Sequence, residues 1–113
     1  MGLDSFWKMP EETKDNHPKH PEFNPPLQLC GGMLSGSGQS SFRGKVYAGL
    51  IHSVTGVDIY QETISNDTIK KMAEKLDKED FDFIHEFSDE ECNDMVRMFR
   101  AYADAGATLH GWW

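Results

Sequence analysis

Two histidines and a cysteine in the N-terminal third of the chain have side chains that suit a metal ion. His17 and His20 are close in sequence, and Cys30 follows ten residues later. Imidazole and thiolate are ligands that zinc prefers, but structural zinc sites usually draw four such ligands from two close pairs. This spacing supplies one close pair, so a solvated proline-rich loop is the favoured interpretation. No metal or other cofactor is expected.

A glycine-rich stretch at residues 36–47, GSGQSSFRGKVY, has the composition of an anion site. It departs from a phosphate-binding Walker loop because five residues separate Gly38 from Gly44, and Val46 follows Lys45. It also carries extra residues compared with a kinase glycine loop. We therefore expect a flexible loop that leads into a helix, with an anion bound at the helix N-terminus as the alternative. The candidate anion-binding residues are Gly36, Gly38, Arg43 and Lys45.

The acidic residues of this chain are concentrated in one stretch. Nine of nineteen lie between Asp77 and Asp94, where Lys78 is the only base, so this stretch alone carries the formal net charge of −8. Like charge in a block is costly unless it faces water, a cation or a basic partner. A calcium loop that begins at Asp80 fails because Ile84 stands at its fifth position. A face that binds a basic protein surface is the main hypothesis, and a solvated edge is the alternative. Its candidate residues are Asp80, Asp82, Glu86 and Asp89.

The C-terminus contributes the last group of candidates. His110 stands just before Trp112 and Trp113, and each tryptophan can bury about 150–250 Å². These rings either lock the chain end into the core, which is favoured, or form an exposed binding platform. His52 is expected on a helix surface. No G-x-S-x-G nucleophile motif is present, so no catalytic residue is expected.

Length and composition limit the class of protein. A chain of 113 residues is the size of one domain, and an aromatic content of 12% argues against disorder. No run of 18 apolar residues predicts a transmembrane helix, and the first residues do not have the pattern of a signal peptide. Two cysteines do not make a disulfide framework, so free thiols in a reducing cytoplasm are expected.

The chain ends predict extended structure, separated by a long loop. Residues 1–9 and 107–113 are short apolar stretches, predicted as extended segments that pair with each other. Residues 10–40 contain all five prolines, which disfavour helix and strand. We expect a long Pro/Gly-rich loop there, partly held to the core by its apolar residues Phe23, Leu27, Leu29, Met33 and Leu34.

Three helices are expected in the body of the chain. The first spans Phe42 to Thr55, with Ser40 or Ser41 as its N-cap and Gly56 closing it; Gly44 and Gly49 predict close approach of another element. A short extended piece covers residues 57–60. The second helix follows Ser65 or Asn66 and buries one apolar stripe. The third begins at Ser88, in a capping box with Glu91, and ends at Gly106. Its buried stripe is Cys92, Met95, Val96, Phe99, Tyr102 and Ala103.

The opening Met1-Gly2-Leu3-Asp4 resembles a loose set of short, uncharacterised phage and metagenomic proteins that begin with the same four residues. The resemblance implies an accessory protein of viral or bacterial origin that acts in the bacterial cytoplasm.

The sequence predicts a single α+β domain over residues 1–113, with a three-helix body, short extended segments at both termini and the long loop at 10–40. A small acidic module that binds or inhibits another macromolecule is the main functional hypothesis. No direct nucleic-acid contact and no membrane contact are expected. The alternative is a small metal- or anion-dependent enzyme that uses the Pro/Gly-rich loop and its histidines.

Overall fold

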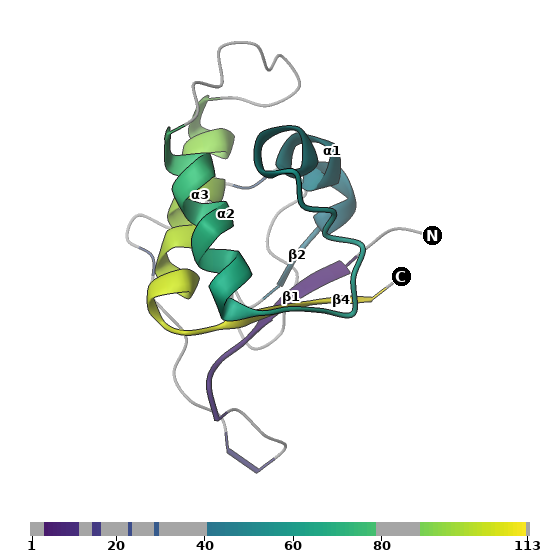
Figure 1. Ribbon diagram of the computed structural model, residues 1–113, viewed down its shortest axis with the longest axis vertical. Coiled ribbons are helices and arrows are strands. Elements are labelled where there is room, and N and C mark those ends of the chain that lie inside the picture. The colour runs from purple at the N-terminus through teal and green to yellow at the C-terminus, as the bar shows by residue number, and fades with distance from the viewer. Residues whose placement is uncertain are drawn as a thin grey trace.

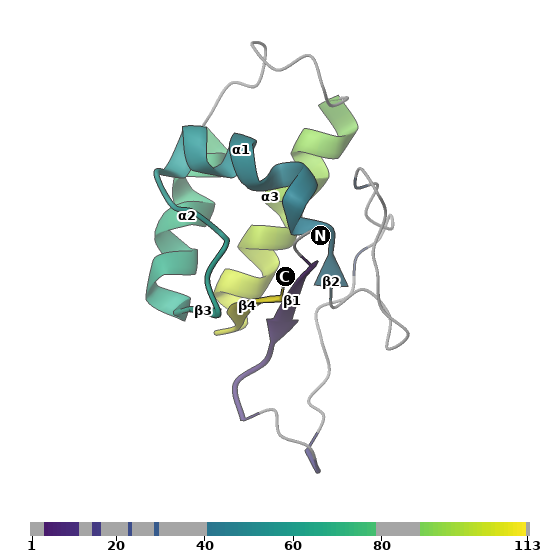
Figure 2. The ribbon, with the colours of Figure 1, turned by 90° about the vertical axis from the view of Figure 1, so that its right-hand side faces the viewer.

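The computed structural model describes residues 4–11, 15–16, 23, 29, 41–78 and 89–112, and the side chains of residues 4, 89 and 112 lie outside this description. It has an α+β fold, as predicted, in which three helices lie on one side of a four-stranded antiparallel sheet (Figures 1 and 2). The strands follow the order β2-β1-β4-β3. Within the described residues, every helix is too short or too polar to cross a membrane.

The two ends of the chain form the centre of the sheet. Strand β1, Asp4–Lys8, pairs antiparallel with β4, Thr108–Trp112, over five residue pairs, which confirms the predicted pairing of the termini. On its other side β1 pairs with β2, Ser41–Phe42, while β3, Thr63–Ile64, pairs with β4. The strand before the second helix therefore lies at 63–64, whereas the sequence predicted an extended piece at 57–60.

Helix α1, Gly44–Thr55, starts later than predicted. Arg43 precedes it as the N-cap residue and makes no side-chain cap hydrogen bond, so neither Ser40 nor Ser41 is the cap. Ser41 pairs with Phe6 in the sheet, and the helix can begin only after the chain leaves that strand. Gly56 closes the helix at φ 75° as predicted. A Cβ added at Gly49 would meet no described atom within 4 Å, so the close packing predicted at that glycine is wrong.

Helix α2, Asn66–Lys78, has the predicted cap and stripe. The Thr68 amide donates to Ser65 Oγ at 3.4 Å, and the Ile69 amide donates to the Ser65 carbonyl at 3.0 Å. A side-chain oxygen at this position satisfies an amide that the helix itself leaves unpaired. The stripe predicted to face the core is buried: Ile69, Met72, Ala73 and Leu76.

Helix α3, Asp89–Asp104, buries its predicted stripe, with Val96 partly covered and Met98 as an additional core residue. It ends in a Schellman motif, in which the Ala107 amide donates to the Tyr102 carbonyl at 3.0 Å and the Gly106 amide to the Ala103 carbonyl at 3.2 Å. This motif turns the chain directly into β4. Ser88, the predicted cap, lies outside the described residues.

The core lies between the helices and the inner face of the sheet. Trp7, Phe42, Ile64 and Leu109 point into it from the four strands, each at most 3% exposed. The predicted anchoring of the long loop is confirmed at two positions, while Leu27, Met33 and Leu34 lie outside the described residues. Leu29 is buried in the core. The Phe23 ring packs on that of Tyr102, with the two ring centroids 6.3 Å apart.

Candidate functional site

The side of the sheet that faces away from the helices carries the candidate site. Side chains alternate across a strand, so the residues next to the buried ones point outward. Register then places Phe6 beside His110, and His110 beside Thr63. Lys8 pairs with Thr108 on the same side. We call this side the outer face and define it by Phe6, Lys8, Thr63, Thr108 and His110.

An aromatic pair lies at the centre of the outer face. The rings of Phe6 and His110 are stacked, with centroids 5.4 Å apart and an interplanar angle of 17°. Phe6 is nevertheless 40% exposed, and in the described part of the chain Tyr60 is the other exposed large hydrophobic residue. An exposed ring still presents apolar surface to water, and covering that surface is favourable.

Two threonines hold the imidazole of His110 in place. Thr63 Oγ1 lies 3.2 Å from His110 Nδ1, and Thr108 Oγ1 lies 2.9 Å from His110 Nε2. A neutral imidazole has one donor and one acceptor nitrogen, and a hydroxyl can satisfy either one. Residues of β3 and β4 thus fix the imidazole of His110, and β1 supplies the phenyl ring of Phe6 that stacks on it. This arrangement suits a rigid contact surface.

The described groups of the outer face offer hydrogen bonding and apolar contact. Nδ1 and Nε2 of His110 each contact the hydroxyl of a threonine, and each can take part in a hydrogen bond as donor or acceptor, depending on the tautomer. In the part of the chain that the structure describes, no three His, Cys, Asp or Glu side chains come together in a way that could hold a metal ion.

Of the predicted partner-binding residues, the structure describes His110 fully and two others by their backbone. Asp89 is the first residue of α3, and Trp112 is the last residue of β4. Asp89 stands at the N-terminal end of α3, whereas β4 follows the C-terminal end of that helix, so the two positions are separated by the whole helix and the strand. Asp80, Asp82, Glu86 and Trp113 lie outside the described residues.

The acidic stretch is less isolated in space than in sequence. Asp94 Oδ1 accepts a hydrogen bond from Arg97 Nη1 at 2.8 Å, and Asp77 Oδ2 accepts one from Arg100 Nη1 at 2.9 Å. Asp94 is also only 8% exposed. Two acids of the stretch are thus paired with bases on α3.

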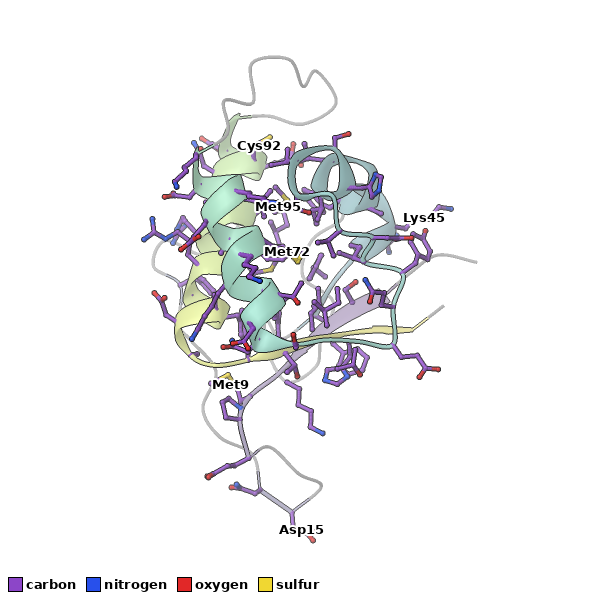
Figure 3. All side chains as sticks on the ribbon, viewed as in Figure 1. Met9, Asp15, Lys45, Met72, Cys92 and Met95 are labelled. Atoms are coloured by element: carbon purple, nitrogen blue, oxygen red, sulfur yellow. The ribbon has the colours of Figure 1, made fainter. Side chains whose placement is uncertain are left out.

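The predicted anion site is described only in its second half. Arg43 and Lys45 are exposed at the start of α1, whose first turn contains no acidic residue, and Lys45 projects away from the core (Figure 3). Gly36 and Gly38 lie outside the described residues. The possible metal ligands His17, His20 and Cys30 lie outside them too.

A second surface feature is an open hollow of about 320 Å³ between α2 and α3. Its floor includes Ala73 and Ala103, which are buried, and the ion pair of Asp77 and Arg100 forms part of its wall. The charged residues that line it are Lys70, Glu74, Asp77, Lys78, Arg100 and Asp104. Their formal charges cancel, so this hollow indicates no particular class of ligand.

Sequence reasoning identified His110 but missed its neighbours on the outer face. Phe6 and Trp7 are adjacent and both aromatic, so hydrophobicity does not show which one faces the core. The pairing of the termini was the signal that could have found them. Leu109 is buried and pairs with Trp7, so both residues face the core. The next pair, Phe6 and His110, must then face the opposite side of the sheet.

Comparison of the chain with models of protein families, with curated proteins and with solved structures gives no match.

Proposed function

We propose that this chain is a small acidic binding module, not an enzyme, that docks on another protein molecule through the outer face. The observation that carries the proposal is the Phe6 ring, 40% exposed and stacked on His110 on the side of the sheet that the helices leave uncovered. Aromatic residues are enriched at the centres of protein interfaces because a rigid ring buries much apolar area at a small entropic cost.

Charge favours a protein over a nucleic acid as the partner. Nucleic-acid binding depends on lysine and arginine side chains that replace counterions along the phosphate backbone. The chain carries −8, and Lys8 is the only residue of the outer face with a full positive charge. The net negative charge of the molecule would therefore repel a phosphate backbone, and on the outer face only Lys8 would attract it.

The acidic stretch is a second contact surface in this proposal. Glu90 is exposed at the start of α3, the end of the helix far from the sheet (Figure 1). A basic protein can therefore be bound there while the outer face is occupied. In keeping with the resemblance of its first four residues, the module would act as an accessory protein in the bacterial cytoplasm.

Site-specific photo-crosslinking tests the proposal. Benzoylphenylalanine replaces Phe6 in one variant and His52, exposed on α1, in a control variant, and both are irradiated in cells. We expect an adduct with a defined protein from position 6 that is missing from position 52. Equal adduct patterns from the two positions would reject the outer face as a binding surface.

A further inference from the structure

We infer that β1 is a replaceable occupant of its place in the sheet, and that the same strand from a second copy of the chain can take that place. We call this place the slot and define it as the gap between β2 and β4 that Asp4–Lys8 fills. The inference goes beyond the proposed function, because it concerns how β1 itself is held.

The chain supplies β1 separately from the elements that surround it. Residues 41–112 contain β2, the three helices, β3 and β4, whereas β1 comes before residues 9–40. Figure 2 shows β1 between β2 and β4. A strand of the same sequence makes the same contacts in the slot whichever copy supplies it. Exchange of an identical element between copies is a low-cost route to dimers.

Pairing and burial hold β1 in the slot. Five residue pairs join it to β4, and two join it to β2. Trp7 is 1% exposed, and its ring packs on those of Phe42, Phe99 and Tyr102, with centroid separations between 4.6 and 6.1 Å. Strand addition draws affinity from main-chain hydrogen bonds and specificity from pockets for alternate side chains. The slot thus selects an extended strand with an inward-facing tryptophan.

The two inward-facing residues of β1 fit the slot imperfectly. Among the described residues, the buried side-chain atoms that have no hydrogen-bond partner are Ser5 Oγ and Trp7 Nε1. Both belong to β1. A buried polar group without a partner lowers stability, because it has given up its hydrogen bonds to water. These atoms regain water when β1 leaves, so β1 leaves more readily than a fully satisfied strand would.

Occupation of the slot determines whether the outer face exists. Phe6 lies on β1 and stacks on His110 of β4, so the ring pair is lost when β1 leaves. The β1 strand of a second copy brings its own Phe6 and rebuilds the pair. A dimer formed by exchange therefore carries two outer faces, each made of residues from both copies.

The chain's own β1 competes strongly with a strand from another copy. A segment that is tied to its binding site acts at an effective concentration on the order of 1 mM. A strand of the same sequence added in trans therefore half-fills the slot at about 1 mM. Removing the Ser5 hydroxyl from the added strand should lower this concentration about fivefold, because that strand no longer buries an unsatisfied group.

A labelled synthetic peptide with the sequence of residues 1–12 tests the inference on the full chain. Fluorescence anisotropy follows the peptide as the chain is added. The wild-type peptide should reach half-saturation at about 1 mM, and the Ser5→Ala peptide at about 0.2 mM. The Trp7→Ala peptide is the control. It should bind at least about tenfold more weakly than the wild-type peptide, because it lacks the aromatic anchor.

A disulfide across the slot shows whether the peptide enters it. Lys8 and Thr108 are paired on β1 and β4. Paired residues of antiparallel strands have Cα atoms about 4.5–5.5 Å apart, which is within the range of a disulfide. The variant Lys8→Cys/Thr108→Cys should bind the peptide when reduced and lose this binding when oxidised, because the bond keeps β1 in place.

Hydrogen exchange of the full chain measures the release of β1 without an added strand. The amides of residues 5–8 should exchange at least about tenfold faster than the best protected amides of α3, since β1 opens locally. Ser5→Ala should slow this exchange about fivefold.

Four results would overturn the inference. They are no peptide binding at about 1 mM, equal binding of the Trp7→Ala and wild-type peptides, equal binding to the oxidised and reduced chains, and β1 amides that exchange as slowly as those of α3. Each would show that β1 is a fixed part of the core.

Discussion

The indole of Trp7 lies flat on the ring of Tyr102, with centroids 4.6 Å apart and an interplanar angle of 5°. The rings of Phe99 and Trp7 are packed edge to face, with centroids 5.1 Å apart and an interplanar angle of 84°. One buried side chain of β1 thus joins the central strand to two successive turns of α3. Phe6, the next residue toward the N-terminus, faces the opposite side, so this contact also holds the outer face in position.

Replacing Trp7 with alanine should lower the free energy of unfolding by about 3–5 kcal/mol, because truncating a buried aromatic leaves a cavity. That is a large share of the stability of a small domain. Urea denaturation followed by circular dichroism measures the loss. Lys8→Ala on the same strand is the control, with an expected change within about 0.5 kcal/mol. Equal effects of the two variants would contradict the assignment of Trp7 to the inner face.

The origin of Trp7's burial shows what sequence patterns can predict here. Apolar residues at both termini predicted the β1–β4 pair, and a regular stripe after Ser65 predicted α2, because each pattern is local and repeated. Strand β2 was not predicted, since Ser41–Phe42 is too short for a pattern and exists only by pairing with β1. The stack of Phe6 on His110 joins residues from the two ends of the chain, so no local pattern reveals it.

Ser5 presents a buried hydroxyl that has no hydrogen-bond partner among the residues that the structure describes. The residue is fully buried on the inner face of β1, between Phe42 and Gly111 in the sheet register. An unsatisfied buried polar group costs about 1–3 kcal/mol. Ser5→Ala should therefore raise the free energy of unfolding by about 1 kcal/mol and increase the melting temperature. A lower melting temperature would show that the hydroxyl has a favourable partner, such as a bound water.

Asn66 connects the start of α2 to the end of α3. Its Nδ2 donates to the carbonyl of Ala103 at 3.2 Å and to that of Ala107 at 2.9 Å. Asn66→Asp has nearly the same shape but loses both donated bonds and places a carboxylate against two carbonyl oxygens. We expect a loss of about 2–3 kcal/mol in urea denaturation, larger than that of Asn66→Ala. If the aspartate variant is as stable as the wild type, these two bonds do not contribute to stability.

Gly106 and Gly56 offer a matched pair of helix ends, both with left-handed backbone, at φ 81° and φ 75°. A Cβ added to Gly56 meets no atom within 4 Å, whereas one added to Gly106 lies 3.0 Å from Cγ of Pro10. Gly56→Ala should thus cost only the strain of the left-handed conformation, about 1–2 kcal/mol. Gly106→Ala should cost more, because Pro10 must also move, and Pro10 continues the chain just beyond β1. Comparing the free energies of unfolding of the two variants isolates the contribution of this contact. Equal losses would show that Pro10 moves aside freely, and Gly106 would then be required for its backbone conformation alone.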